Sequence, residues 1–213
     1  MRCSILYVAV AVLMLNAKAN AAPILFDTDP FAGSTALTTP GRQIVANELF
    51  TVFDIATDVF TFDASVFGIT SIDFANDVVG NLPTSGVNTV VLRTFDNDND
   101  PMTPFGAGNA ANLIADRLTT PAPGFFVYFN QGLDLARLVF STDLNDNTSD
   151  LKVLARLTNL TGQVGRDSFP QFSEANFAIS QVPEPSTLSL LIAAGGLLAA
   201  RSRFRPARPR ADH

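Results

Sequence analysis

The sequence predicts an all-β fold, an antiparallel β-sandwich or jelly roll with one short helix, followed by a single C-terminal transmembrane helix. Phe, Val, Thr and Asn are frequent between residues 22 and 181, whereas Glu, a good helix former, occurs there only twice. Short runs of alternating apolar and polar residues are separated by clusters of Asp, Asn, Gly and Pro. A separate apolar segment, residues 188–200, supplies the transmembrane helix.

The predicted strands each consist of alternating apolar and polar residues that end at a turn-forming cluster. They are expected at residues 50–53, 58–62, 89–95, 124–130, 136–141, 151–158 and 175–180. Short strands at this spacing, without helical runs between most of them, are typical of an antiparallel sandwich or jelly roll.

One helix is predicted over residues 109–118. Apolar side chains recur there at roughly helical spacing, and Pro121 follows as a residue that ends helices. A turn-rich loop is the alternative for this segment.

Residues 1–21 have the features of a secretory signal peptide. Arg2 supplies the positive start, residues 5–15 are apolar, and Ala19 or Ala21 ends an A-x-A cleavage site, of which we favour Ala21. The apolar stretch makes only about 16 Å of helix, too short for a hydrocarbon core of about 30 Å, and an uncleaved anchor is the alternative. The single cysteine lies in this segment, so we expect no disulfide in the mature chain.

Residues 182–213 combine several features in a fixed order. Pro183, Glu184 and Pro185 come first, and the two prolines favour an extended backbone because they cannot join a helix interior. The apolar run 188–200 follows. It makes about 20 Å of helix, a marginal membrane span.

Basic residues come after the apolar run, beginning with Arg201, Arg203 and Arg205. A cluster of arginines beside an apolar segment keeps that side in the cytoplasm, because each guanidinium costs roughly 2.5 kcal/mol or more at the bilayer centre. We therefore expect these arginines to hold the tail inside while the preceding domain lies outside the inner membrane.

The string VPEPSTLSLLIAAGGLLAARSRFR, residues 182–205, resembles the PEP-CTERM sorting segment of Gram-negative bacteria. The resemblance implies cleavage near the Pro-Glu-Pro signature by an exosortase, a membrane-embedded transpeptidase-like enzyme. It also implies a transient inner-membrane anchor and then an outer-surface or extracellular location, usually in organisms that make exopolysaccharide. A terminal helix packed into the domain is the alternative, but five arginines and the pair Gly195 and Gly196 fit a packed helix poorly.

The segment between the two ends, residues 22–181, is long enough for one domain with its own core. It carries 18 acidic and seven basic residues, a net charge of −11. The whole-chain charge of −6 hides this because both ends are basic. Nucleic acid and anionic membrane surfaces are poor partners for such a charge.

Two clusters of Asp and Asn are candidate calcium sites. The first contains Asp96, Asp98 and Asp100 at alternate positions, and Ca²⁺ prefers carboxylate oxygens from a flexible loop. The second lies at residues 143–150. The first lacks the glycine and glutamate of an EF-hand loop. Turns are the favoured interpretation of both clusters, because Asp and Asn side chains bond to their own backbone.

Catalytic residue types are scarce in this domain. The only histidine, His213, lies in the sorting segment, which excludes histidine-dependent triads and histidine-bound zinc from residues 22–181. A hydrolase that uses two carboxylates stays open, although no spacing selects a pair. We assign no catalytic residue.

A sugar-binding platform would use exposed aromatic rings. The predicted strand 124–130 places Phe126 and Tyr128 on one face and Phe125 and Phe129 largely on the other. A fully buried strand explains this pattern at least as well as a platform.

Together these observations predict a non-catalytic protein that an exosortase sorts to the cell surface or extracellular matrix. There we expect a structural or interaction role in association with exopolysaccharide. A calcium-dependent glycan-binding module or adhesin is the first alternative, and a carboxylate-based hydrolase is the second. The candidate Ca²⁺ is the one cofactor that the sequence suggests.

Overall fold

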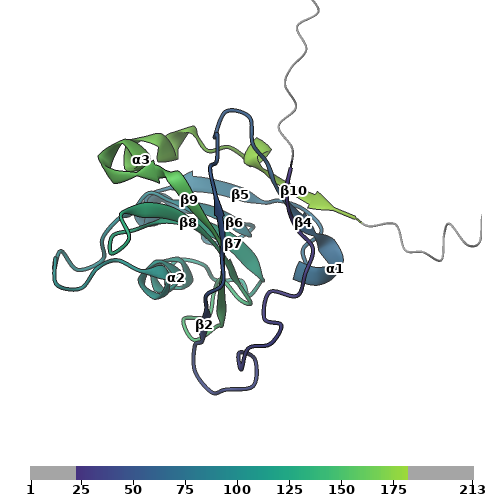
Figure 1. Cartoon of the computed structure of the whole chain (residues 1–213). Helices are drawn as coiled ribbons and strands as arrows, with labels where there is room; N and C mark the ends of the chain where they lie inside the picture. Colours follow the sequence, from purple (N-terminus) through teal and green to yellow (C-terminus); the bar gives the residue numbers. More distant parts are fainter. Residues whose placement is uncertain (1–22, 182–213) are drawn as a thin grey trace, which may run out of the picture.

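The computed structural model describes residues 23–181, which Figure 1 shows in colour. These residues form two β-sheets with a few short helices. The strands are β1 (Ile24–Phe26), β2 (Ile44–Val45), β3 (Leu49–Thr51), β4 (Phe60–Asp63), β5 (Phe74–Asp77), β6 (Thr89–Leu92), β7 (Gly124–Asn130), β8 (Leu135–Ser141), β9 (Leu151–Thr161) and β10 (Phe177–Ser180). The helices are α1 (Ala64–Phe67), α2 (Ala107–Ala115) and α3 (Gly162–Ser168), with the 3-10 turns η1 (Val79–Asn81), η2 (Phe169–Gln171) and η3 (Glu174–Asn176).

The larger sheet has seven strands in the described part of the chain. Its order is β2-β9-β8-β7-β6-β5, and β3 also pairs with β9. The central strands β7, β8 and β9 are antiparallel neighbours, whereas β2, β3, β5 and β6 join through parallel pairs. A short turn links β7 to β8, and its last residue, Asp134, has a φ of 53°. Asp tolerates this left-handed backbone because its short polar side chain bonds locally.

The smaller sheet has three described strands, all of them parallel. β4 lies between β1 and β10, with Ile24, Phe60 and Phe177 in register. Parallel neighbours need long connections, and here β1 and β10 come from the two ends of the described domain. Because the three strands run the same way, the start of β1 and the end of β10 lie at opposite ends of this sheet.

Phenylalanine rings fill the space between the two sheets. Phe62 of β4 stacks on Phe125 of β7 with ring centroids 3.7 Å apart, and Phe53 stacks on Phe60 at 4.1 Å. All four rings are fully buried. Since burying one such ring contributes about 2 kcal/mol, these stacks are a main source of the energy that joins the sheets.

Helix α2 covers the other face of the larger sheet, and Figure 1 shows it on the opposite side from α1. Ala110 and Ile114 of α2 share a buried cluster with Phe105, Phe126 and Tyr128. All seven residues of β7 are therefore buried, as in a sheet that is covered on both faces.

The predicted β-rich composition is confirmed, but the predicted antiparallel pairing of strands is wrong for most pairs. The smaller sheet is entirely parallel, and parallel pairs form both margins of the larger one. A jelly roll, which needs antiparallel strands, is not what these residues form. Residue alternation reports an extended backbone, whereas strand direction depends on long connections that alternation does not describe.

All seven predicted strands are confirmed as elements. The predicted strand 124–130 has the bounds of β7, and the other predictions overlap β3, β4, β6, β8, β9 and β10. The pattern does not predict β1, β2 or β5. Their sequences are ILF, IV and FAND, in which apolar and polar residues do not alternate.

The predicted helix over residues 109–118 is confirmed as α2, which begins two residues earlier. The expectation of a single helix is wrong, because α1 and α3 are also present. Helix α1 has only four residues, started by the side chain of Asp63, which accepts the Ser65 N–H at 2.7 Å. Helix α3 has the sequence GQVGRDS, in which two glycines and a single apolar residue give no helical period.

Candidate functional site

The chain leaves the domain through β10. Its last residue, Ser180, pairs with Asp63 of β4. The predicted sorting signature at 183–185, the predicted arginine anchor at 201–205, the transmembrane helix and the signal peptide all lie outside the described residues. Within residues 23–181, no helix is long and apolar enough to cross a membrane.

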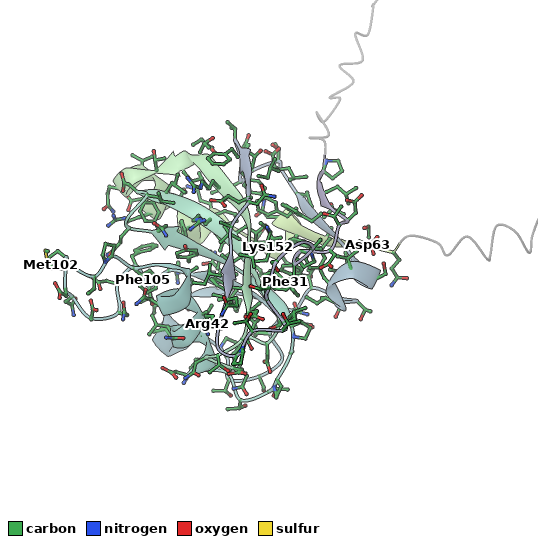
Figure 2. All side chains as sticks on the ribbon, turned by 60° about the horizontal axis from the view of Figure 1, so that its bottom comes forward. Phe31, Arg42, Asp63, Met102, Phe105 and Lys152 are labelled. Carbon is green, nitrogen blue, oxygen red and sulfur yellow. The ribbon has the colours of Figure 1, made fainter. Side chains whose placement is uncertain are left out.

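The first acidic cluster forms an exposed loop, with Met102 at its outer tip in Figure 2. Asp96 accepts the N–H groups of Asp98 and Asn99 at 3.1 Å. Asp98 accepts the N–H of Asp100 at 3.0 Å, and Asp100 accepts that of Met102 at 2.9 Å. These are the bonds of successive turns in which Asp side chains cap their own backbone.

One of these hydrogen bonds also affects the ionisation of Asp96. The N–H of Asp98 is the main reason that the pKa of Asp96 lies below its usual value. Across the described residues 23–181, no group of three or more His, Cys, Asp or Glu side chains is arranged to hold a metal ion. The contacts of Asp96, Asp98 and Asp100 are therefore those expected of turns. Calcium binding at these residues stays a prediction.

The second acidic cluster fastens neighbouring segments to the larger sheet. Asp150 is buried and accepts the N–H groups of Leu37 and Gln43, both at 2.6 Å. Asp143 accepts the N–H of Ala122 at 3.1 Å. These carboxylates replace backbone partners that the irregular segments lack, which is a structural role.

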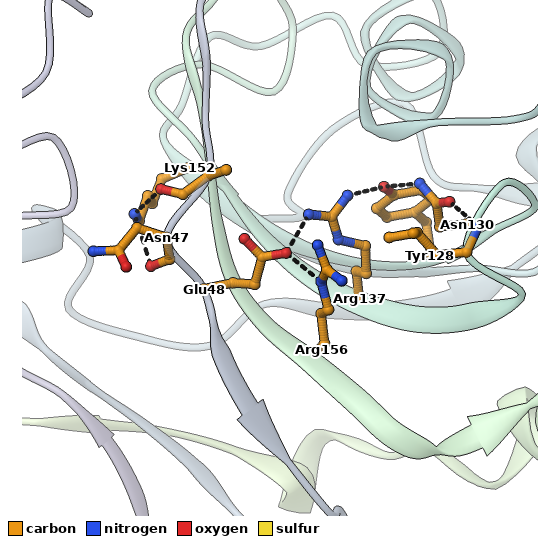
Figure 3. Close-up of polar contacts among 9 residues, drawn as sticks. Asn47, Glu48, Tyr128, Asn130, Arg137, Lys152 and Arg156 are labelled. Carbon is orange, nitrogen blue, oxygen red and sulfur yellow. Dashed lines mark hydrogen bonds and ion pairs between the residues drawn. The ribbon is translucent and has the colours of Figure 1, made fainter.

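A buried ion cluster lies beside β3 (Figure 3). Glu48 directly precedes this strand, and its side chain is 3% exposed. Its Oε1 atom accepts a hydrogen bond from Arg137 of β8 at 2.8 Å and another from Nε of Arg156 on β9. Two guanidinium groups thus share one carboxylate, and Glu48 is tied to β8 and β9.

The cluster extends across the sheet because its members are in register. Tyr128 pairs with Arg137, Arg137 with Arg156, and Arg156 with Phe50. Residues directly opposite one another in neighbouring strands project to the same face, so these side chains form a row. The Tyr128 hydroxyl accepts hydrogen bonds from Asn130 at 2.9 Å and from Arg137 at 3.4 Å. The Arg156 guanidinium lies 4.7 Å from the centre of the Phe50 ring, a cation–π distance.

Two opposing effects act on the ionisation of Glu48. Burial raises the pKa of its carboxyl group, but the hydrogen bond from Arg156 and the charges of Arg137 and Arg156 outweigh burial. The pKa of Glu48 therefore lies below its usual value, and the group is ionised at neutral pH. A carboxyl group that acts as a general acid needs the opposite shift.

The aromatic run of β7 belongs to the core. Phe125 and Phe129 face the smaller sheet, whereas Phe126 and Tyr128 lie in the cluster with α2, as alternation predicts. All four rings are fully buried. The buried-strand interpretation is confirmed, and these rings do not form an exposed platform for sugars.

Sequence reasoning does not predict the Glu48 cluster. Glu48 lies 89 residues from Arg137 and 108 residues from Arg156 along the chain. The one available signal is that Glu48 is among only two glutamates between residues 22 and 181. The rarity of glutamate singles out Glu48 in the sequence but does not predict that Arg137 and Arg156 bind it.

Comparison with known proteins identifies the segment that follows the domain. Residues 181–205 match the family model of the PEP-CTERM protein-sorting motif. No curated protein and no solved structure matches the chain. The match begins at Gln181, directly after β10, so the motif follows the folded domain without a spacer. Such a motif implies export, a membrane-anchored sorting signal and processing by an exosortase, and the chain therefore carries a PEP-CTERM sorting motif.

Proposed function

We propose that this protein is a non-catalytic component of the cell surface or extracellular matrix, where its domain acts as a structural or interaction module beside exopolysaccharide. The observation that carries the proposal is the PEP-CTERM match at residues 181–205, because that motif implies exosortase processing and a surface destination. The domain that precedes the motif is the part that such processing would leave at the surface.

The charge of the domain supports this role. Residues 22–181 carry 18 acidic and seven basic residues, a net charge of −11. A charge of this size favours solubility and disfavours association with anionic lipid or nucleic acid. A domain with this surface would remain in solution or in the matrix once its anchor is removed.

The use of the buried carboxylates also supports a non-catalytic role. Glu48 and Asp150 both hold neighbouring segments to the larger sheet through short hydrogen bonds. A carboxylate-based hydrolase needs one carboxyl group with a raised pKa beside an ionised one. The pKa of Glu48 is lowered instead, which suits a fixed ion pair.

Sorting is tested in the producing cell by replacing Pro183, Glu184 and Pro185 with alanine. We expect the wild-type protein at the surface or in the medium, with a mass below that of residues 22–213, and the variant uncleaved in the inner membrane. The control is Val164→Ala, because Val164 is exposed on α3 and lies outside residues 181–205. A wild-type protein that stays uncleaved in the membrane would contradict the sorting step.

The matrix role is tested with exopolysaccharide purified from the same cells. We expect the secreted protein to sediment with the polysaccharide and to release no reducing ends from it during long incubation. Release of reducing ends would favour the hydrolase alternative. Absence of both binding and hydrolysis would reject exopolysaccharide as the partner and leave the sorting result unaffected.

A further inference from the structure

A hollow of about 420 Å³ lies between the margins of the two sheets. Residues of β1 and of the following segment form one side, and residues of β3 and β9 form the other. Its apolar lining comes chiefly from Leu25, Phe26, Leu49, Phe67 and Leu154, and Lys152 lines it as its cation. This volume falls in the range of small-molecule sites, roughly 300 to 1,000 Å³.

Lys152 is a buried cation without an anionic partner in the described residues 23–181. It is 9% exposed, and its Nζ donates to the carbonyl oxygens of Ala46 at 2.8 Å and Asn47 at 3.2 Å (Figure 3). An ammonium group has three N–H donors, so one donor lacks a protein acceptor in this range. Glu48, the carboxylate whose charge acts on Lys152, is already bonded to two arginines.

The positive charge of Lys152 is not balanced by a close negative charge in the described residues. Burial lowers the pKa of Lys152, and the charge of Glu48 only partly opposes that effect. A buried charge without a close partner is unfavourable because it has lost its water without gaining an equivalent contact. An anion in the hollow would supply both the missing acceptor and the missing negative charge.

The side chains that line the hollow also indicate the chemistry of the rest of the ligand. Apolar side chains on both sides would contact an apolar body, and Leu25 and Leu49 at the opening are about half exposed when the hollow is free. Asp29 lines the same hollow and is exposed, so it would repel a second negative charge on the ligand. The best complement is a single carboxylate on an apolar chain or ring.

We propose that the hollow between β1 and β9 binds a small organic monocarboxylate, with its carboxylate on Lys152 and its apolar body against Leu25 and Leu154. None of the lining residues belongs to the sorting motif, and the proposal goes beyond the proposed function without depending on it.

The test is calorimetric titration of the purified full-length protein with hexanoate at pH 7. We expect saturable binding to the wild type and binding at least about tenfold weaker to Lys152→Met, which removes the charge-assisted hydrogen bond. Methionine keeps the apolar stem of lysine and removes a buried charge, so we expect the variant to fold, as circular dichroism and thermal melting would verify. Neutral hexanamide should bind wild type at least about tenfold more weakly than hexanoate.

A matched pair of variants distinguishes hexanoate binding in the hollow from a general effect of surface charge on binding. Leu25→Glu adds a negative charge at the opening and should weaken hexanoate binding about tenfold. Val164→Glu makes the same kind of change on α3, beyond the opposite end of β9 from Lys152, and should leave binding unchanged.

Three results would overturn the proposal. The first is no hexanoate binding to the wild type, and the second is equal binding to wild type and Lys152→Met. The third is glucuronate, a carboxylate on a polar body, binding as tightly as hexanoate, since the apolar lining would then play no part.

Discussion

Glu48 holds two guanidinium groups at once, so its removal would leave Arg137 and Arg156 without their shared anion. We expect Glu48→Gln to lower the free energy of unfolding by about 2–3 kcal/mol, less than the full cost of breaking a buried pair because both arginines keep some contact with water. Chemical denaturation measures this difference. Glu174→Gln is the matched control, because Glu174 is exposed and its change should stay within about 0.5 kcal/mol. Equal losses in the two variants would contradict a special role for Glu48.

The same carboxylate makes stability depend on pH. The folded-state pKa of Glu48 lies below the ordinary value of 4.5, so its contribution is fully present above the unfolded pKa and is lost as pH falls through the folded one. We expect the difference in unfolding free energy between wild type and Glu48→Gln to be constant from about pH 7 to 5 and to shrink below about pH 4.5. Denaturation curves at a series of pH values measure it. A free-energy difference between the two proteins that grows as the pH falls would contradict this prediction.

Asp96 stabilises the acidic loop by accepting two backbone N–H groups. We expect Asp96→Ala to speed proteolysis near the exposed Met102, because those donors lose their acceptor. If the loop is only a set of turns, calcium and a chelator should leave the melting temperature of the wild type unchanged. A rise with calcium that Asp98→Asn abolishes would instead establish the calcium site, because a ligand that binds only the folded state raises its stability.

At the scale of single elements, β7 depends on a glycine at its first residue. A Cβ atom at Gly124 would lie within 3.0 Å of the carbonyl oxygen of Asn88, which already accepts the Phe125 N–H at 2.8 Å. We expect Gly124→Ala to cost about 3 kcal/mol of stability, since the Asn88 backbone and the buried Leu144 side chain that the Cβ would meet cannot easily move. Gly80→Ala is the control, because a Cβ there meets nothing within 4 Å. Thermal or chemical denaturation measures the stability of both variants. Similar losses of stability would mean that the close approach of Asn88 to Gly124 is not the cause.

The strands and helices also show which parts of the fold can be predicted from the sequence. β7 and α2 are predictable because each has enough residues to show its own period, two for a strand and about 3.6 for a helix. β2 has two residues and α3 contains two glycines, so neither has a period to find. The Glu48 cluster joins segments about a hundred residues apart. The parallel strand pairs join residues between 15 and 117 positions apart, and no local pattern reports these pairings either. The sorting motif is predictable because its signature, apolar run and arginines are contiguous.

At the scale of the whole molecule, Phe62 links the two sheets. Its ring stacks on Phe125 at 3.7 Å and also contacts Phe26 and Phe67, with centroids 5.6 and 5.7 Å away. We expect Phe62→Ala to cost about 4 kcal/mol. Amide hydrogen exchange should then rise in β1, β4 and β10 before it rises in β8, because the smaller sheet loses its contact with the larger one.

The control for this change is Phe50→Ala. Phe50 is 63% exposed and its main contact is the Arg156 guanidinium, so we expect a loss of about 1 kcal/mol or less and no selective exchange in the smaller sheet. Uniform exchange across both sheets in Phe62→Ala would contradict the idea that the smaller sheet separates first.

The parallel pairing of β10 with β4 has a mechanical consequence for a chain that continues into a membrane-held tail. Tension applied beyond Ser180 runs along the axis of β10, in shear, so the paired positions from Phe177 to Ser180 bear the load together instead of opening one after another. The strand that is pulled is also flanked by the rings of Phe60 and Phe74, which lie 5.9 and 5.7 Å from that of Phe177. We therefore expect β10 to keep its pairing with β4 when the chain beyond Ser180 is under tension.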